Sequence, residues 1–261
     1  MTQVWMARRG GPEVLEVRDV ARPEPGPGEV RVRVAAAGVN FADVMRRRGL
    51  YPDAPTLPAV AGYEVAGTVD AVGAGADAAL EGREVVAMTN FVGYSEWVCV
   101  PAGLAWVRPD GVDAVTAAAV PVNYLTAWQM LRVMAPPAAG ETVLIHSAAG
   151  GVGHAALQLA ALSGARILAS ASPAKHEGLK AAGAGAVFDS REPKFAARVR
   201  DATGGAGADV VLEPRHGRWI MESYRSLAKC GRLVLFGFSS AAVGAGSGTL
   251  SALRTLARVP W

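Results

Sequence analysis

One glycine-rich segment has the clearest chemical potential in this sequence. Residues 147–153 read SAAGGVG, and they stand between an apolar run at 142–147 and a helical pattern at 151–162. Glycine at 150 and 151 would let the backbone come close to a ligand with no Cβ in the way, and Gly153 would let the helix pack tightly on the strand. Helix N–H groups and the helix dipole then favour a phosphate.

This strand–turn–helix context predicts the pyrophosphate site of a dinucleotide, with tight packing alone as the alternative. Ala148 stands where the fingerprint usually has its first glycine. The expected ligand contacts are Ala149, Gly150, Gly151, Val152 and Gly153.

The end of the next strand indicates which dinucleotide is bound. NAD-binding units usually place an acid about twenty residues beyond the glycines, on the adenosine ribose. Here residues 169–176 read ASASPAKH, without an acid. Ser170, Ser172 and Lys175 suit a 2′-phosphate instead, which predicts NADPH rather than NADH. In the alternative interpretation, Ser172 caps the helix and Lys175 is solvated.

The elements around these motifs predict an α/β fold with a parallel, doubly wound sheet. Continuous apolar runs are typical of strands buried on both faces, and here they alternate with helical patterns. Strands are expected at 142–147, 166–170, 186–188, 209–212 and 232–236, and helices at 151–162, at 173–182 and from 193 and 220. Residues 239–248 are expected to form a mobile loop.

The first third of the chain is rich in short strands. Alternating patterns predict strands at 4–6, 15–17, 30–34, 64–72, 84–88 and 97–100. Their spacing indicates a compact, barrel-type domain rather than βα repeats. We therefore expect two domains, residues 1–122 and 123–261.

Charge and cysteine content exclude several classes. The net charge is +3 over 261 residues and the cations are dispersed, so no nucleic-acid surface is expected. The densest cluster, Arg46 to Arg48, is interpreted as a solvated helix face, with a phosphate or membrane contact as the alternative. Cys99 and Cys230 lack metal-ligand spacing and are expected to be free thiols. The sequence shows neither a secretory signal nor a membrane span, so a cytoplasmic protein is predicted.

Several motifs stand in a recognisable order: GVNFAD at 38–43, RGLY at 48–51, GYEVAGTV at 62–69, VNYLTA at 122–127, then AAGGVG and SPAK. Residues 28–261 thereby resemble the quinone oxidoreductase branch of the medium-chain dehydrogenase/reductase superfamily, especially its vesicle amine transport protein-like members. The resemblance implies a GroES-like catalytic domain followed by an NADP-binding Rossmann domain.

The resemblance also implies a site without metal. Zinc-dependent relatives place a cysteine and a histidine where this chain has Asn40 and Tyr63, and zinc needs about four ligands, mostly N or S. By position, Asn40, Asp43 and Tyr51 are expected on the catalytic wall, with Asp43 better suited to organising its loop than to acting as an acid. Thr126, Phe236 and Gly237 are expected beside the nicotinamide.

Three departures from the family pattern stand out. Glu213-Pro214 is followed by Arg215 and His216 instead of glycines, and these would either crowd the nicotinamide or point to solvent. Ser190 replaces a tyrosine near the adenosine phosphate. The chain ends at Trp261, where relatives continue, so a truncation is expected that removes an edge strand and, with it, the usual surface of a homodimer.

Together these features predict an NADPH-dependent, zinc-free oxidoreductase that transfers a hydride to a quinone or an α,β-unsaturated carbonyl compound. The alternative is a non-catalytic NADPH-binding protein of the same fold, regulatory or membrane-associated.

Overall fold

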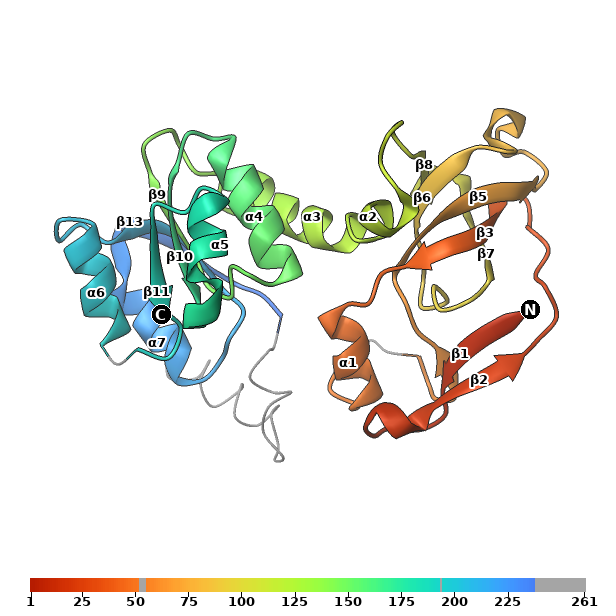
Figure 1. Ribbon diagram of the computed structural model, residues 1–261, viewed down its shortest axis with the longest axis horizontal. Helices are drawn as coiled ribbons and strands as arrows, with labels where there is room; N and C mark the ends of the chain where they lie inside the picture. Colours follow the sequence, from red (N-terminus) through yellow and green to blue (C-terminus); the bar gives the residue numbers. More distant parts are fainter. Residues whose placement is uncertain (52–54, 193, 238–261) are drawn as a thin grey trace. The chain divides into compact units, whose positions relative to one another are not determined.

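A computed structural model describes residues 1–51, 55–192 and 194–237 of the chain. Contacts divide the chain into two compact units, Met1–Val122 and Asn123–Trp261 (Figure 1). The loop expected at 239–248 and the chain end lie outside the described residues.

The first unit is built on antiparallel sheets (Figure 1). The larger sheet has the strand order β7-β3-β5-β6-β8 and the smaller has the order β2-β1-β4. The larger sheet comprises β3 (Glu29–Ala37), β5 (Glu64–Val72), β6 (Glu84–Met88), β7 (Trp97–Pro101) and β8 (Ala105–Val107). The smaller comprises β1 (Thr2–Met6), β2 (Leu15–Asp19) and β4 (Ala59–Val60). Every strand predicted in this part of the chain is confirmed within a few residues.

Two irregularities in the pairing of β3 with β5 bend the larger sheet, as β-bulges do. Valines at alternate positions of its strands, such as Val30 and Val32, enter one core cluster. The helices of this unit are short: α1 (Phe41–Arg47) and α2 (Ala114–Ala118), with 3₁₀ turns at Pro12–Val14, Ala78–Leu80 and Ala102–Leu104. The chain reaches the second unit through α3 (Pro121–Trp128).

The second unit is a parallel sheet with strand order β11-β10-β9-β12-β13. The strands are β9 (Thr142–Ile145), β10 (Arg166–Ala171), β11 (Ala186–Asp189), β12 (Ala208–Glu213) and β13 (Leu227–Leu235). In chain order this is 3-2-1-4-5, the arrangement of Rossmann sheets. The predicted α/β fold is confirmed, although β13 begins five residues before the predicted strand at 232.

Helices cover both faces of this sheet because its strands are apolar at successive positions. Val143 and Ile145 pack with α4 (Gly151–Ala161) and α5 (His176–Ala181). The intervening Leu144 packs with Phe195 on the opposite face, which carries α6 (Phe195–Ala202) and α7 (Arg218–Arg225). A π-helical turn at Gln129–Met134 follows α3, and a 3₁₀ turn at Pro173–Lys175 precedes α5.

Candidate functional site

The turn between β9 and α4 is made by an unexpected residue. Ser147 takes a left-handed conformation, with φ 52°, which is uncommon outside glycine. The amide of Ala148 donates to the carbonyl of Ser170, and that of Gly150 donates back to the carbonyl of Ser147. Ala148, which stands in the first glycine position of the fingerprint, is fully buried. Alanine is accommodated there because Ser147, not residue 148, takes the left-handed conformation of the turn.

The three glycines that follow have three different surroundings. A Cβ on Gly150 would have a single neighbour within 4 Å, the Ser147 carbonyl at 3.3 Å. A Cβ on Gly151 would collide with the side chain of Asn123, and one on Gly153 would stand 2.7 Å from the Cα of Ala148. Gly153 therefore serves close helix–strand packing, as predicted, whereas Gly151 makes room for Asn123.

Gly150 and Gly151 are exposed at the start of α4. Gly150 is the N-cap residue of this helix, which runs for eleven residues and has no acidic side chain in its first turn. The first amides of a helix have no partner within the helix and carry its positive dipole end. This end of α4 is consequently suited to an anion.

The predicted 2′-phosphate residues separate into two groups. The Ser170 hydroxyl lies 2.8 Å from Nδ1 of His146, and Ser170 is fully buried. It points inward because it follows Leu168 by two positions on the α6 side of the sheet, so its predicted role as a phosphate donor is wrong. Ser172 and Lys175 are exposed, and Ser172 is the N-cap residue of the 3₁₀ turn without a side-chain capping bond.

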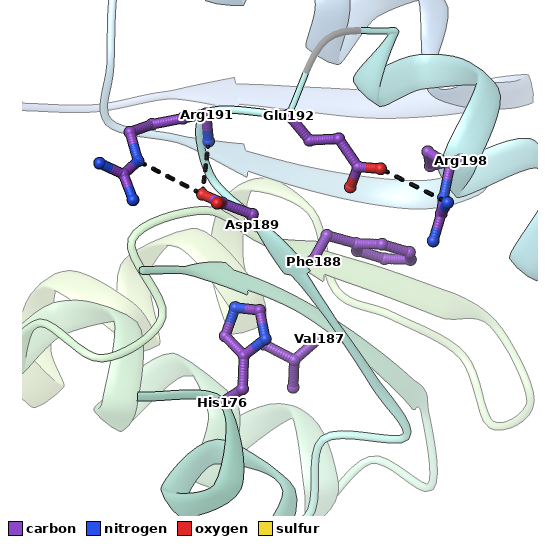
Figure 2. Close-up of a pocket in the computed structure, with 7 residues that line it drawn as sticks. All are labelled: His176, Val187, Phe188, Asp189, Arg191, Glu192 and Arg198. Carbon is purple, nitrogen blue, oxygen red and sulfur yellow. Dashed lines mark hydrogen bonds and ion pairs between the residues drawn. The ribbon is translucent and has the colours of Figure 1, made fainter. Parts of the chain in front are cut away.

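An open hollow of about 480 Å³ lies at the carboxyl end of β11 (Figure 2). Its charged side chains are paired, Arg191 with Asp189 at 3.5 Å and Arg198 with Glu192 at 3.4 Å. His176, the residue after Lys175, lines the hollow and contacts the carbonyl of Ala171 through Nε2 at 3.1 Å. The hollow thus combines balanced charge with an apolar wall of Val187 and Phe188.

A buried polar network occupies the carboxyl ends of β9, β10 and β12. The Glu213 carboxylate accepts from Nε and Nη2 of Arg215 at 3.0 and 2.9 Å, and from the Ser223 hydroxyl at 2.5 Å. Nη2 of Arg215 also approaches Nδ1 of His146 at 2.7 Å, while Nη1 donates to the carbonyl of Ser190. Arg215 thereby connects the end of β12 with His146, which follows β9, and with Ser190, which follows β11.

His146 is neutral in this network. Burial lowers its pKa to about 3, and the Arg215 charge acts in the same direction. Since Arg215 donates to Nδ1, the proton of His146 resides on Nε2, 3.0 Å from the Ser223 hydroxyl.

Arg215 and His216 do not point to solvent. They are 9 % and 7 % exposed, and Nε2 of His216 contacts the carbonyl of Gly237 at 2.7 Å. The Arg215 guanidinium also lies over the Trp219 ring, 4.3 Å from its centroid. Of the two alternatives for these residues, the solvent-facing one is wrong.

In the first unit, Asn40 is fixed by a glutamate that the sequence analysis did not single out. Nδ2 of Asn40 donates to Oε1 of Glu64 at 2.7 Å, and the amide of Val122 donates to Oε2 at 2.8 Å. Glu64 is 1 % exposed, and burial raises its pKa. A Cβ on Gly38 would collide with this carboxylate, so glycine at 38 gives it room. The sequence signal was an acid at the first position of a strand, directly before the apolar residues Val65 and Ala66.

Asp43 organises the same loop, as expected. Its Oδ2 accepts from the amide of Asn40 and the hydroxyl of Tyr94, both at 2.9 Å, and its Oδ1 accepts from the amide of Gly62 at 3.0 Å. Burial raises the pKa of Asp43, although these hydrogen bonds oppose the shift. With three donors on one buried carboxylate, Asp43 ties Asn40, Gly62 and Tyr94 together.

Aromatic rings and a buried arginine surround this loop. The Tyr63 ring lies 6.2 Å from that of Tyr51 and 4.8 Å from that of Phe91. Arg46 stacks over Phe91 at 4.6 Å from the ring centroid and is 1 % exposed; Arg47 is 8 % exposed. The solvated helix face predicted for these arginines is wrong for Arg46 and Arg47, because α1 packs this side inward.

Metal-binding groups are scattered in the described structure. Within residues 1–51, 55–192 and 194–237, no three His, Cys, Asp or Glu side chains are grouped to hold a metal ion. Cys99 and Cys230 are free thiols, as expected. No helix in the same ranges is long and apolar enough to cross a membrane.

Both halves of the chain match known protein families. Residues 26–110 match the model of the alcohol dehydrogenase GroES-like domain, and residues 151–256 match that of zinc-binding dehydrogenase. Mycobacterial Rv1454c, solved in complex with NADPH, is 39 % identical with a TM-score of 0.85, over 92 % of this chain and 74 % of that one. The chain belongs to the quinone oxidoreductase branch of the medium-chain dehydrogenase/reductase superfamily.

Other members of the superfamily show the same similarity. A quinone oxidoreductase from Pseudomonas syringae is 37 % identical with a TM-score of 0.86, over 98 % of this chain and 78 % of that one. The synaptic vesicle membrane protein VAT-1 homolog of Rattus norvegicus is 36 % identical over 92 % of this chain and 60 % of the relative. The chain therefore spans about three-fifths of the length of the curated VAT-1 relatives that it matches.

Proposed function

We propose that this oxidoreductase uses NADPH to reduce a quinone or an α,β-unsaturated carbonyl compound without zinc. The observation that carries the proposal is the turn from β9 to α4, where exposed Gly150 and Gly151 open a helix free of acidic side chains in its first turn. The NADPH complex of mycobacterial Rv1454c supports the choice of dinucleotide.

The proposed cofactor site runs along the carboxyl edge of the parallel sheet. The pyrophosphate would lie on the amides at the start of α4, contributed by Ala149, Gly150, Gly151, Val152 and Gly153. The 2′-phosphate would lie at Ser172 and Lys175, both exposed after β10. Thr126, Phe236 and Gly237 are the proposed neighbours of the nicotinamide, which supplies the hydride when it is bound.

The proposed catalytic wall is Asn40 and Tyr51, with Asp43 holding their loop. A carboxamide nitrogen has two N–H donors, and Glu64 accepts from one of them. The other is then available for the substrate oxygen on which negative charge develops during hydride addition. A donor whose orientation is fixed before the reaction stabilises such charge without a reorganisation cost. Tyr51, half-buried beside Tyr63, is the second proposed donor.

The donor set does not fit zinc. The two positions that hold a cysteine and a histidine in zinc-dependent relatives carry an amide and a phenol here, which are poor zinc ligands. Burial raises the pKa of the Tyr63 phenol, and this disfavours the phenolate that a metal would need. We therefore assign polarisation of the substrate oxygen to hydrogen-bond donors.

Stopped-flow measurement of nicotinamide absorbance tests this function with naphthoquinone and benzylideneacetone. We expect NADPH to be consumed, and Asn40→Ala to lower kcat by about 10²-fold or more, the usual loss for one donor of an oxyanion site. Gln158→Ala, which removes an exposed carboxamide from α4, is the matched control. Lack of turnover of any quinone or enone by the folded chain would refute the proposal.

A second candidate is a regulatory NADPH-binding protein that performs no chemistry. The name of the VAT-1 relatives, synaptic vesicle membrane proteins, favours it. Calorimetric titration with NADPH and NADH, together with flotation on phosphatidylserine-containing liposomes, separates the candidates. NADPH binding and liposome association without turnover would support the second candidate.

A further inference from the structure

Among the described residues of the first unit, the guanidinium of Arg46 is the charged group with the most unpartnered buried donors. Its Nη1 donates to the carbonyl of Val60 at 2.6 Å. Nε and Nη2 are also buried, and neither has a hydrogen-bond partner among the residues that the structure describes. Buried charged donors are normally paired, because the lost hydration is otherwise uncompensated.

The two unpartnered nitrogens form the edge of arginine that holds a carboxylate with two parallel hydrogen bonds. Two other arginines of this chain use the same edge. Arg215 donates through Nε and Nη2 to Glu213, and Arg18 donates through Nε and Nη2 to Glu16 at 3.0 and 2.6 Å. Arg46 presents the same geometry without a carboxylate from the described chain.

Neighbouring groups complete the arrangement. The Tyr63 hydroxyl is likewise buried and has no hydrogen bond of good geometry within the described ranges, although the Tyr51 hydroxyl lies near it. Arg46 lies close enough to Asp43 to feel its negative charge, yet the Asp43 oxygens already accept from three donors. Asp43 therefore attracts the guanidinium from a distance and leaves its carboxylate-binding edge available.

The Phe91 ring packs against both Arg46 and Tyr63, and the backbone of Phe91 is unusual. Phe91 has φ 66°, a left-handed conformation that costs a bulky residue energy. The half-buried Phe91 ring covers the Arg46 guanidinium, and Tyr63 and Tyr51, also half-buried, follow it in a row of neighbouring rings. Rings of this kind offer a conjugated substrate flat contact surfaces.

We propose that the Nε/Nη2 edge of Arg46 and the Tyr63 hydroxyl bind a carboxylate on the substrate, so that the enzyme prefers carboxylate-bearing enones and quinones. The inference rests on the proposed function and names its substrate class. The ligand would enter by displacing the half-buried rings, and its conjugated part would then lie against Tyr51.

A matched substrate series tests this subsite. Benzylideneacetone carrying a para-carboxylate is compared with the same compound carrying a para-carboxamide, which has nearly the same shape without the charge. We expect the intact chain to favour the carboxylate by about tenfold or more in kcat/KM, since charge-assisted bidentate pairs are worth at least that factor.

The variants assign the preference to residues. Arg46→Met should abolish the preference, mainly through KM, Arg46→Lys should retain part of it, and Tyr63→Phe should reduce it. Arg33→Met removes an exposed arginine of β3 and should leave the preference unchanged. An intact chain without the preference, or an Arg46→Met variant that keeps it, would overturn the inference.

Stability measurements and calorimetry separate an effect of Arg46→Met on ligand binding from effects on folding and on activity. If Arg46 lacks an internal anion, Arg46→Met should be at least as stable as the intact chain, because it removes an unpaired buried charge. Should the intact chain reduce neither compound, the proposed function fails, and calorimetric titration with the para-carboxylate alone still tests the subsite. Equal heats for the intact chain and Arg46→Met would then reject it.

Discussion

A Cβ placed on Gly151 would collide with the side-chain carboxamide of Asn123. Asn123 belongs to α3 and Gly151 opens α4, so a side chain of one helix fills the space beside the first residue of the other. The second glycine of the turn is thus required by internal packing, whatever the turn binds. Gly150 has no such neighbour, so it is the residue at which a ligand can approach the backbone.

This relationship predicts a strong coupling between the two positions. Gly151→Ala should lower the free energy of unfolding by about 1–3 kcal/mol, because overpacking forces neighbours to shift. Adding Asn123→Ala should recover most of the loss. Denaturant unfolding of the two single variants and the double variant measures the coupling. Gly150→Ala is the control and should change stability by less than about 1 kcal/mol, and strict additivity at 123 and 151 would contradict the prediction.

The hydrogen bond from Asn40 to Glu64 predicts that this buried acid affects kcat without touching the substrate. In Glu64→Gln, the side chain has one acceptor for two donors, the Asn40 carboxamide and the Val122 amide. Asn40 should lose its fixed orientation, and kcat should fall about tenfold while KM changes little. Glu16→Gln, on the surface beside Arg18, serves as the control for charge. A kcat equal to that of the intact chain would show that Glu64 does not position Asn40.

Much of the fold could be predicted from periodicity. Strands β5 and β6 have the predicted bounds, and the apolar runs at 143–145 and 210–212 are buried on both faces of the parallel sheet. The start of β13 could not be predicted, because Cys230 and Gly231 interrupt its pattern. Cys230 has φ 60° and lies in the register shift of β13 against β12, between the paired residues Leu227 and Arg232.

The site was less predictable, since side-chain direction depends on packing. Ser170 was expected to face a ligand, but two-residue alternation from Leu168 turns it toward His146. Arg46 and Arg47 were expected in solvent, but α1 buries them. Glu64 was missed because an acid at the start of a strand is a weak signal, and its role follows only from Asn40 and Val122 beside it. The positive φ of Ser147 could not be predicted, because the glycines that follow it are the usual residues for such a turn.

The His146 network predicts a specific acid sensitivity. The unfolded imidazole has a pKa near 6.5, and burial lowers it to about 3 in the folded chain. Between these values the unfolded state binds a proton that the folded state does not, so stability falls as the pH drops from 6.5 toward 3. One such group contributes at most about 1.4 kcal/mol per pH unit.

Variants isolate that contribution from the carboxylates that titrate in the same range. His146→Gln keeps an acceptor for Arg215 and a donor for Ser223, but it does not titrate. Its unfolding free energy should fall less steeply with decreasing pH than that of the intact chain. His154→Gln, on the exposed side of α4, should retain the original slope. Parallel pH profiles for the intact chain and His146→Gln would show that the imidazole is protonated when folded.

Lys175 is predicted to decide between the two nicotinamide dinucleotides. It is exposed directly after β10, in a segment whose Ser172 makes no capping bond, so both are available to a 2′-phosphate. Lys175→Ala should weaken NADPH binding about tenfold and leave NADH binding nearly unchanged, because NADH lacks that phosphate. Lys180→Ala is the matched control, since this lysine is exposed on the same segment and pairs with Glu177 at 2.8 Å. Calorimetric titrations of both variants provide the measurement; an equal loss for the two dinucleotides would place the lysine on a part of the cofactor that they share, and no loss would remove it from the site.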